Sequence, residues 1–348
     1  MNIRRIITGC TLCAACIANI YAGDINGFNE ITGVRDTGSR LHGEVYSEMN
    51  YGYNFEGADR NRWDFPHIVA SAVLDMGRGW TLSAELEYER MYEDGEWCDD
   101  HSDNFATNRF YLNKQWNDRF GLKIGIVDVP LGVTNAGGPA LTVYDPLSEA
   151  ALMPMTWHEA GVAVHGTLGG TTIDYMLAAL VCGDLPLEDC RAVGVATALG
   201  WQPFSGMRLS VGGFCGNTSR GMLRHGAPDF IDASFLSYGV AGACYEHAGW
   251  VASGSFIHCT DGDVRSVGVE AGYNVLSSVG DGRWGLTPFV RYDGVFHCPG
   301  GDVDKFTIGL NAALPGNFIV KAEAGRCGYG SYGTVNTLDV SVGYTFVF

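Results

Sequence analysis

The last eleven residues of the chain, LDVSVGYTFVF (338–348), alternate between large apolar side chains and polar or small ones, with Val347 as the exception. A period of two places the two sets on opposite faces of a β-strand. The pattern runs to the final residue, Phe348, and its apolar set ends in three aromatic rings. Such a strand predicts a sheet with one apolar face and one polar face.

The same alternation returns in many segments upstream. It is clearest in WTLSAELEYE (80–89), FGLKIGI (120–126), LTPFVRYD (286–293) and FIVKAEAG (318–325). The second face of these segments often carries full charges, and aromatic rings tend to stand at the segment ends. A soluble sandwich could place such charges in solvent. In a membrane barrel the charged face lines a water-filled lumen, the apolar face meets lipid, and the rings lie at the two interfaces.

Turns of alternating length separate these segments. Tight turns near 77–79, 117–119 and 315–317 alternate with long polar connections such as 93–104, 127–156 and 216–229. This alternation is typical of outer-membrane barrels, which have short periplasmic turns and long external loops. The intervening segments predict about sixteen strands, at 41–52, 67–76, 80–92, 105–116, 120–127, 157–166, 171–181, 192–200, 207–215, 230–245, 250–258, 265–275, 285–293, 304–312, 318–325 and 336–348.

The composition supports the same fold class. The chain is 46% hydrophobic and contains 49 glycines, yet beyond its N-terminus it has no unbroken apolar run long enough for a membrane helix. Within hydrocarbon every backbone polar group needs an internal partner, so a membrane-spanning sheet must close on itself. We therefore expect an all-β protein, a transmembrane antiparallel β-barrel.

The N-terminus predicts export. Residues 1–22 combine a basic start, Arg4 and Arg5, with a short apolar run and a small residue, Ala22, at the expected cleavage point. This apolar run is too short for a membrane anchor, and the nine residues before Cys10 are too few for a lipoprotein signal. We expect a signal peptide at 1–22, a periplasmic N-terminal extension at 23–40 and an outer-membrane barrel at 41–348, in a Gram-negative bacterium.

Charge and cysteine content narrow the function classes. The net charge of −17 becomes more negative once the two signal arginines are removed, which argues against nucleic acid as a partner. The eight cysteines beyond the signal show no CxxC spacing, so we expect no metal site. Cys182 and Cys190 flank one short external loop and form the best candidate disulfide.

The chain also lacks the usual signs of an enzyme. No GxSxG or HExxH motif is present. His158 and Glu159 are adjacent on a predicted strand, so their side chains point to opposite faces and do not readily share one site. We expect no catalytic residues and no cofactor.

The phase of the predicted strands assigns charged side chains to the lumen. Taken singly, each is more readily explained as a solvated charge without a selective role. As a set, acids that face bases across a constriction would orient polar solutes. The candidate pore-lining and constriction residues are Glu85, Glu87, Arg109, Lys123, Asp128, Asp145, Glu149, Asp174, Arg291, Lys321 and Glu323.

Several short stretches carry a resemblance to a known family. They are IGI (124–126), VPLG (129–132), YDP (144–146), MPMTWHEAGV (153–162), TPFVRY (287–292) and GLNAALP (309–315). Together they resemble the phosphate-selective porin O and P family, over most of the chain beyond the signal but in few specific positions. The resemblance implies a sixteen-stranded porin whose third loop folds inward. Phosphate selectivity is not carried over, because it needs a ladder of Arg and Lys and this acidic chain has four lysines.

Residues 127–156 correspond to that third loop. Their middle, 140–144, is more apolar than an exposed loop, which favours packing on the barrel wall over an external cap or a contact with a neighbouring barrel. We expect Asp128, Asp145 and Glu149 to face Arg109 or Lys123 across the pore. The predicted function is passive diffusion of small hydrophilic solutes. A structural or adhesive barrel without transport is the alternative.

The C-terminal strand also suggests how the barrel is assembled. Tyr344, Phe346 and the terminal Phe348 match the kind of signal that the barrel-assembly machinery reads, although Phe348 could be only an interfacial ring. The expected partners are therefore outer-membrane lipid and lipopolysaccharide, the assembly machinery and small hydrophilic solutes. The sequence leaves a homotrimer open.

Overall fold

A computed structural model describes residues 40–56, 60–93, 96–97, 105–133, 140–153, 157–181, 193–216, 235–277, 284–298, 301–330 and 333–348. The predicted signal peptide, nearly all of the 23–40 extension, and both Cys182 and Cys190 lie outside these ranges. No helix in the described residues is both long and apolar enough to cross a membrane.

The described chain is almost entirely β-strand. The strands are β1 (Leu41–Asn54), β2 (Asn61–Gly77), β3 (Trp80–Glu93), β4 (Glu96–Trp97), β5 (Phe105–Asn117), β6 (Phe120–Asp128), β7 (His158–Thr167), β8 (Ile173–Val181), β9 (Val193–Trp201), β10 (Met207–Gly216), β11 (Leu236–His247), β12 (Trp250–Cys259), β13 (Val264–Tyr273), β14 (Gly285–Phe296), β15 (Val303–Leu314), β16 (Phe318–Tyr329) and β17 (Thr334–Val347). Two short helical turns accompany them, α2 (Leu147–Ala150) and the 3-10 turn η2 (Asp261–Asp263).

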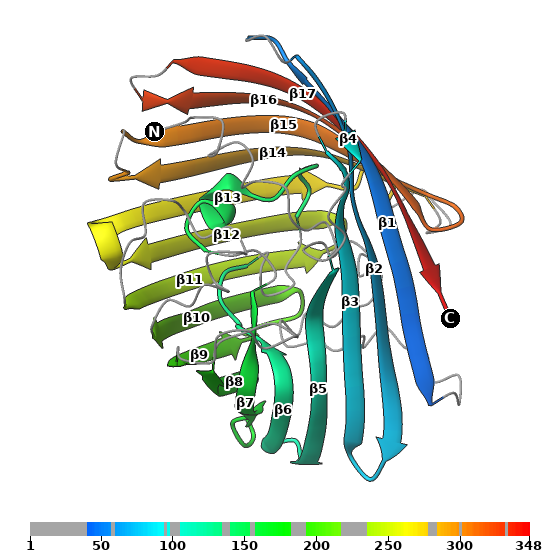
Figure 1. Ribbon diagram of the computed structural model, residues 1–348, viewed down its shortest axis with the longest axis vertical. Coiled ribbons are helices and arrows are strands. Elements are labelled where there is room, and N and C mark those ends of the chain that lie inside the picture. The colour runs from blue at the N-terminus through cyan, green and yellow to red at the C-terminus, as the bar shows by residue number, and fades with distance from the viewer. Residues whose placement is uncertain are drawn as a thin grey trace.

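These strands close into one antiparallel barrel (Figure 1). β4 is a two-residue strand that pairs with β3, and β3 also pairs directly with β5 along its length, so sixteen strands form the wall. Neighbours in sequence are neighbours in the sheet, and β1 pairs with β17 from Glu44 opposite Val347 to Asn54 opposite Thr337. The closure removes both free edges, as hydrocarbon requires. The predicted antiparallel barrel of about sixteen strands is confirmed.

Burial along the strands is inverted relative to a soluble protein. In β17 the apolar Leu338, Val342 and Tyr344 are exposed at 42%, 40% and 40%, whereas Asp339 and Ser341 between them are at 5% and 2%. Exposed large apolar side chains occur on strands throughout the wall, including Phe110, Ile124, Val195, Val269 and Ile308. Burial of polar groups beside exposed apolar ones is unfavourable in water and expected in lipid. The alternating pattern therefore encodes a lipid-facing outer surface and a polar lumen.

The strand β2 begins six residues earlier than the sequence pattern predicts, at Asn61 instead of position 67. Pro66 lies inside it. The register to β3 shifts between Phe65 and His67, so Pro66 occupies an irregularity. A bulge accommodates a proline that cannot donate to the ladder. It also reverses the phase, because Asp64 before it and Val69 after it are both buried.

Candidate functional site: the charged lumen and the inward segment

The lumen is lined by charged side chains from widely separated strands. Of the predicted set, Glu85, Glu87, Lys123, Arg291, Lys321 and Glu323 are all less than 9% exposed. Each lies on the strand face opposite to the exposed apolar residues, as the alternation predicts. Further acids on this face are Glu48, Asp64, Glu270, Asp293 and Asp339.

Two arginines of the wall, Arg109 and Arg208, are bound to carboxylates. Arg109 Nε donates to Asp128 Oδ1 at 2.7 Å, and its Nη1 lies 3.5 Å from Glu85 Oε2. Arg208 binds Asp174 through two hydrogen bonds of 2.8 and 2.7 Å. Charge-assisted contacts of this kind, and the bidentate Arg208–Asp174 pair above all, fix side-chain orientation. The positive charge of these arginines is therefore largely neutralised within the wall.

Arg291 on β14 contacts two acids and also Ser148, which lies in the connection between β6 and β7. Its Nη2 lies 2.8 Å from Asp293 Oδ1, and its Nη1 lies 3.4 Å from Glu270 Oε2. The same Nη2 donates to Ser148 Oγ at 3.2 Å. All three charged side chains are at most 2% exposed. A buried set of this kind is held by its mutual pairing, and removal of one member leaves the others uncompensated.

Other predicted lumen residues bind neutral partners. Lys123 Nζ donates to the Tyr111 hydroxyl at 3.1 Å and lies 4.4 Å from the centre of that ring. Glu87 accepts a hydrogen bond from the amide of Asn108. These contacts keep long charged side chains close to the wall.

Residues 140–153 lie inside the barrel, where Figure 1 shows the short helix α2 against the wall near β13. The helix contacts β12, β13 and β14. Three backbone amides of this inward segment donate to lumen carboxylates: Leu141 N to Glu270 at 3.2 Å, Val143 N to Glu323 at 2.7 Å and Ser148 N to Asp293 at 3.1 Å. Lys321 Nζ donates to the Thr142 carbonyl oxygen. The wall therefore supplies both acceptors and donors that the segment's backbone requires.

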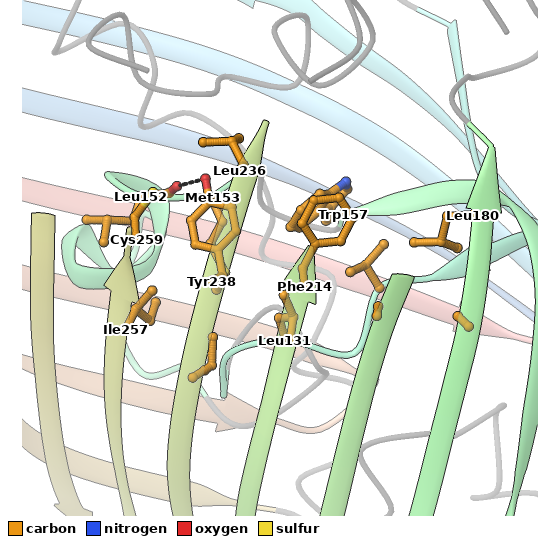
Figure 2. Close-up of a cluster of buried hydrophobic side chains, with 14 of the residues drawn as sticks. Leu131, Leu152, Met153, Trp157, Leu180, Phe214, Leu236, Tyr238, Ile257 and Cys259 are labelled. Atoms are coloured by element: carbon orange, nitrogen blue, oxygen red, sulfur yellow. Dashed lines mark hydrogen bonds between the residues drawn. The ribbon is translucent and has the colours of Figure 1, made fainter. Parts of the chain in front are cut away.

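Apolar packing holds the two ends of the connection 127–156, together with the adjacent Trp157 (Figure 2). These two ends are called the roots of the inward segment below. Leu131, Leu152, Met153 and Trp157 are at most 1% exposed and pack on inward-facing side chains of β8, β10, β11 and β12. The Trp157 and Phe214 ring centres are 4.6 Å apart, and the Tyr238 hydroxyl donates to the Leu152 carbonyl at 2.6 Å. Full burial of each such side chain contributes about 1.5–3 kcal/mol. This side of the lumen is largely apolar, with the Arg208–Asp174 pair on β10 and β8 as its charged element, while β1–β6 and β13–β17 carry the other charges described above.

Asp128, Asp145 and Glu149 were expected to face Arg109 or Lys123. Asp128 binds Arg109. Glu149 accepts a hydrogen bond from the Val133 amide at 2.9 Å, which joins the outgoing and returning arms of the segment. Asp145 is buried at the tip, at 6% exposure.

The sequence pattern missed Arg62, Asp64 and Tyr144, which meet inside the barrel. The Tyr144 hydroxyl donates to Asp64 Oδ2 at 3.2 Å, and the Arg62 guanidinium carbon lies 4.4 Å from the centre of the Tyr144 ring. The usable signal was the alternation of Arg62 and Asp64 with the apolar Trp63 and Phe65, which Pro66 obscured.

Within the described ranges, no three His, Cys, Asp or Glu side chains are grouped so that they could hold a metal ion. The described residues Cys215, Cys244, Cys298 and Cys327 are free thiols.

No protein-family model matches the chain. A stretch of 124 residues, 35% of the chain, is 24% identical to an uncharacterized protein of Aquifex aeolicus (strain VF5), and it spans only 28% of that relative's length. The resemblance to the phosphate-selective family therefore stays an expectation.

The barrel is similar to solved structures at low sequence identity. Salmonella typhi OmpF in complex with daunomycin matches with a TM-score of 0.67 and 12% identity, over 90% of this chain and 99% of that one. A mutant of the Rh. blastica porin matches with a TM-score of 0.55 and 13% identity, over 88% and 100%. The outer-membrane protein OmpT of Vibrio cholerae in its trimer form matches with a TM-score of 0.55 and 12% identity, over 88% and 98%. These matches show that the chain has the barrel fold of outer-membrane porins.

Proposed function

We propose that this protein is a non-enzymatic outer-membrane channel through which small hydrophilic solutes diffuse passively. The observation that carries the proposal is the inverted barrel, with apolar side chains outside and polar and ionisable side chains inside. A sixteen-stranded barrel is wide enough to leave an aqueous channel. The fold shared with a porin and with an outer-membrane protein supports the location and the activity.

The residues 127–156 form the constriction in this proposal. Their described part is bound to lumen side chains of β13, β14 and β16 and fills part of the cross-section. Among the described residues, lumen acids outnumber lumen bases, and the arginines are bound to acids. The channel should therefore prefer cations weakly or show little ion selectivity, and phosphate selectivity is not proposed.

The remaining parts of the proposal follow from location. Residues 1–22 direct export and are removed, and the apolar belt contacts lipid and, in the outer leaflet, lipopolysaccharide. The barrel-assembly machinery inserts the chain. The trimer form of OmpT, which has the same fold, supports a homotrimer as the assembly to look for.

The test is excision of residues 133–150 and their replacement by a short Gly-Ser linker. Gly132 lies beside the Met153 side chain, so a short linker can join the two ends that remain. We expect a folded barrel whose single-channel conductance and solute size limit are both raised. A deletion of comparable length between β10 and β11, at 217–234, is the control and should leave conductance unchanged.

Two outcomes would contradict parts of the proposal. Unchanged conductance in a folded excision variant would show that 127–156 is not the constriction. A folded wild-type barrel that conducts no ions would contradict the channel itself and favour a structural or adhesive barrel.

A further inference from the structure

The tip of the inward segment is bound to strands on a different part of the wall from the rest of that segment. Leu141, Val143 and Ser148 bind β13, β16 and β14, whereas Tyr144 reaches β2. Its hydroxyl donates to Asp64, and its ring lies under the Arg62 guanidinium. The segment therefore extends from its roots beside β8–β12 to the N-terminal strands.

The binding place of Tyr144 is built from three strands. Asp64 is 1% exposed and forms an ion pair with Arg62, whose Nε lies 2.7 Å from Asp64 Oδ2. A Cβ atom at Gly52 of β1 would lie 2.9 Å from Asp339 Oδ1 of β17 and 3.4 Å from the Tyr144 hydroxyl. A side chain at position 52 would therefore displace the Asp339 carboxylate and lie in direct contact with the Tyr144 hydroxyl. The place lies on β1, β2 and β17, across the seam where the barrel closes.

We propose that Gly52, Arg62, Asp64 and Tyr144 form a latch that holds the tip of the inward segment and so sets the cross-section of the pore. This inference rests on the proposed channel function. The four are positioning residues. They act on solutes through the place of the segment, because Arg62 is already engaged by the Tyr144 ring and the Asp64 carboxylate.

The chemistry of the latch makes arginine specific. A planar guanidinium can stack on an aromatic ring and at the same time form an ion pair with a carboxylate. A lysine at position 62 would keep the charge but could not make both contacts in the same geometry. A phenylalanine at position 144 would keep the ring and lose the hydrogen bond to Asp64.

The experiment measures single-channel conductance and open-channel current noise in planar bilayers for Tyr144→Ala, Tyr144→Phe, Arg62→Lys and Gly52→Ala. A released tip should widen the pore and move in it, so Tyr144→Ala should raise conductance by about 1.5-fold or more and increase the noise. Tyr144→Phe, Arg62→Lys and Gly52→Ala should increase the noise with a smaller change in conductance. Heat-modifiable mobility on gels selects folded barrels for recording.

Tyr51→Phe is the matched control. The Tyr51 hydroxyl donates to Asn61 at 2.8 Å between the same two strands, β1 and β2. Its loss should change neither conductance nor noise, although it removes an equivalent hydrogen bond. If Tyr144→Ala and Gly52→Ala give folded barrels with wild-type conductance and noise, the latch is wrong. The excision of 133–150 would still raise conductance in that case, which separates failure of the latch from failure of the constriction.

Discussion

At the scale of single residues, the C-terminal Phe348 has a structural place that its sequence position alone does not reveal. Its amide donates to the Gly43 carbonyl at 2.9 Å, and its carbonyl accepts from the Gly43 amide at 3.0 Å. The Phe348 ring covers Gly43 so closely that a Cβ atom there would lie 2.4 Å from the ring. The last residue therefore completes the seam between the first and last strands.

Deletion of Phe348 should reduce the folded fraction far more than Tyr292→Ala. Both rings lie on the outer surface, at 54% and 39% exposure, but only Phe348 also closes the seam. The folded fraction can be measured by heat-modifiable gel mobility after refolding and after expression in cells. Equal losses in the two variants would mean that Phe348 is no more than an interfacial ring.

At the scale of elements, the inward segment combines apolar roots with a polar tip region. The roots supply most of the apolar burial that stabilises the segment, because Trp157, Leu152 and Met153 are fully buried. The hydrogen bonds of the tip region fix where the segment lies in the lumen, because its backbone amides bind Glu270, Glu323 and Asp293.

Trp157→Ala should loosen the root without opening the wall. The ring is 1% exposed and packs on Phe214 and Tyr238, so its removal leaves a large cavity and should cost about 3–5 kcal/mol of unfolding free energy. Urea unfolding in detergent or lipid measures this loss. Trp201→Ala, which removes an outward ring at 47% exposure, is the control. Equal destabilisation by the two variants would contradict the packing role of Trp157.

The connection between β8 and β9 carries the proposed disulfide. A disulfide between Cys182 and Cys190 would close a short loop. In an oxidising compartment it would contribute about 2–3 kcal/mol to the free energy of unfolding. Mass spectrometry of the unreduced protein should find the two cysteines in one linked peptide pair. Alkylation of both thiols without prior reduction would exclude the bond.

The alternation in the sequence was sufficient to assign the barrel and the lumen side of Glu85, Lys123 and Arg291. It did not identify Arg62 and Asp64 as lumen residues. Pro66 interrupts the alternation there, and the strand continues through it by means of a register shift between Phe65 and His67. Nor did the alternation predict which acids would bind the backbone of the inward segment. Those contacts join residues more than a hundred positions apart, and local periodicity carries no information about such pairs.

At the scale of the whole molecule, the described strands present large apolar side chains on the outside and more acids than bases in the lumen. The lumen arginines are neutralised in pairs with Asp64, Asp128, Asp174 and Asp293. The remaining field should then come mainly from the carboxylates, and a field of this sign raises the local concentration of cations.

The most direct test of the channel is single-channel recording in a planar bilayer, with the reversal potential measured under a salt gradient. The account predicts discrete, stable conductance steps and a reversal potential that is near zero or shifted modestly towards cations. The shift should shrink as ionic strength rises, because salt screens the lumen charges. The absence of conductance in a folded barrel, or a strong preference for chloride or phosphate, would contradict it.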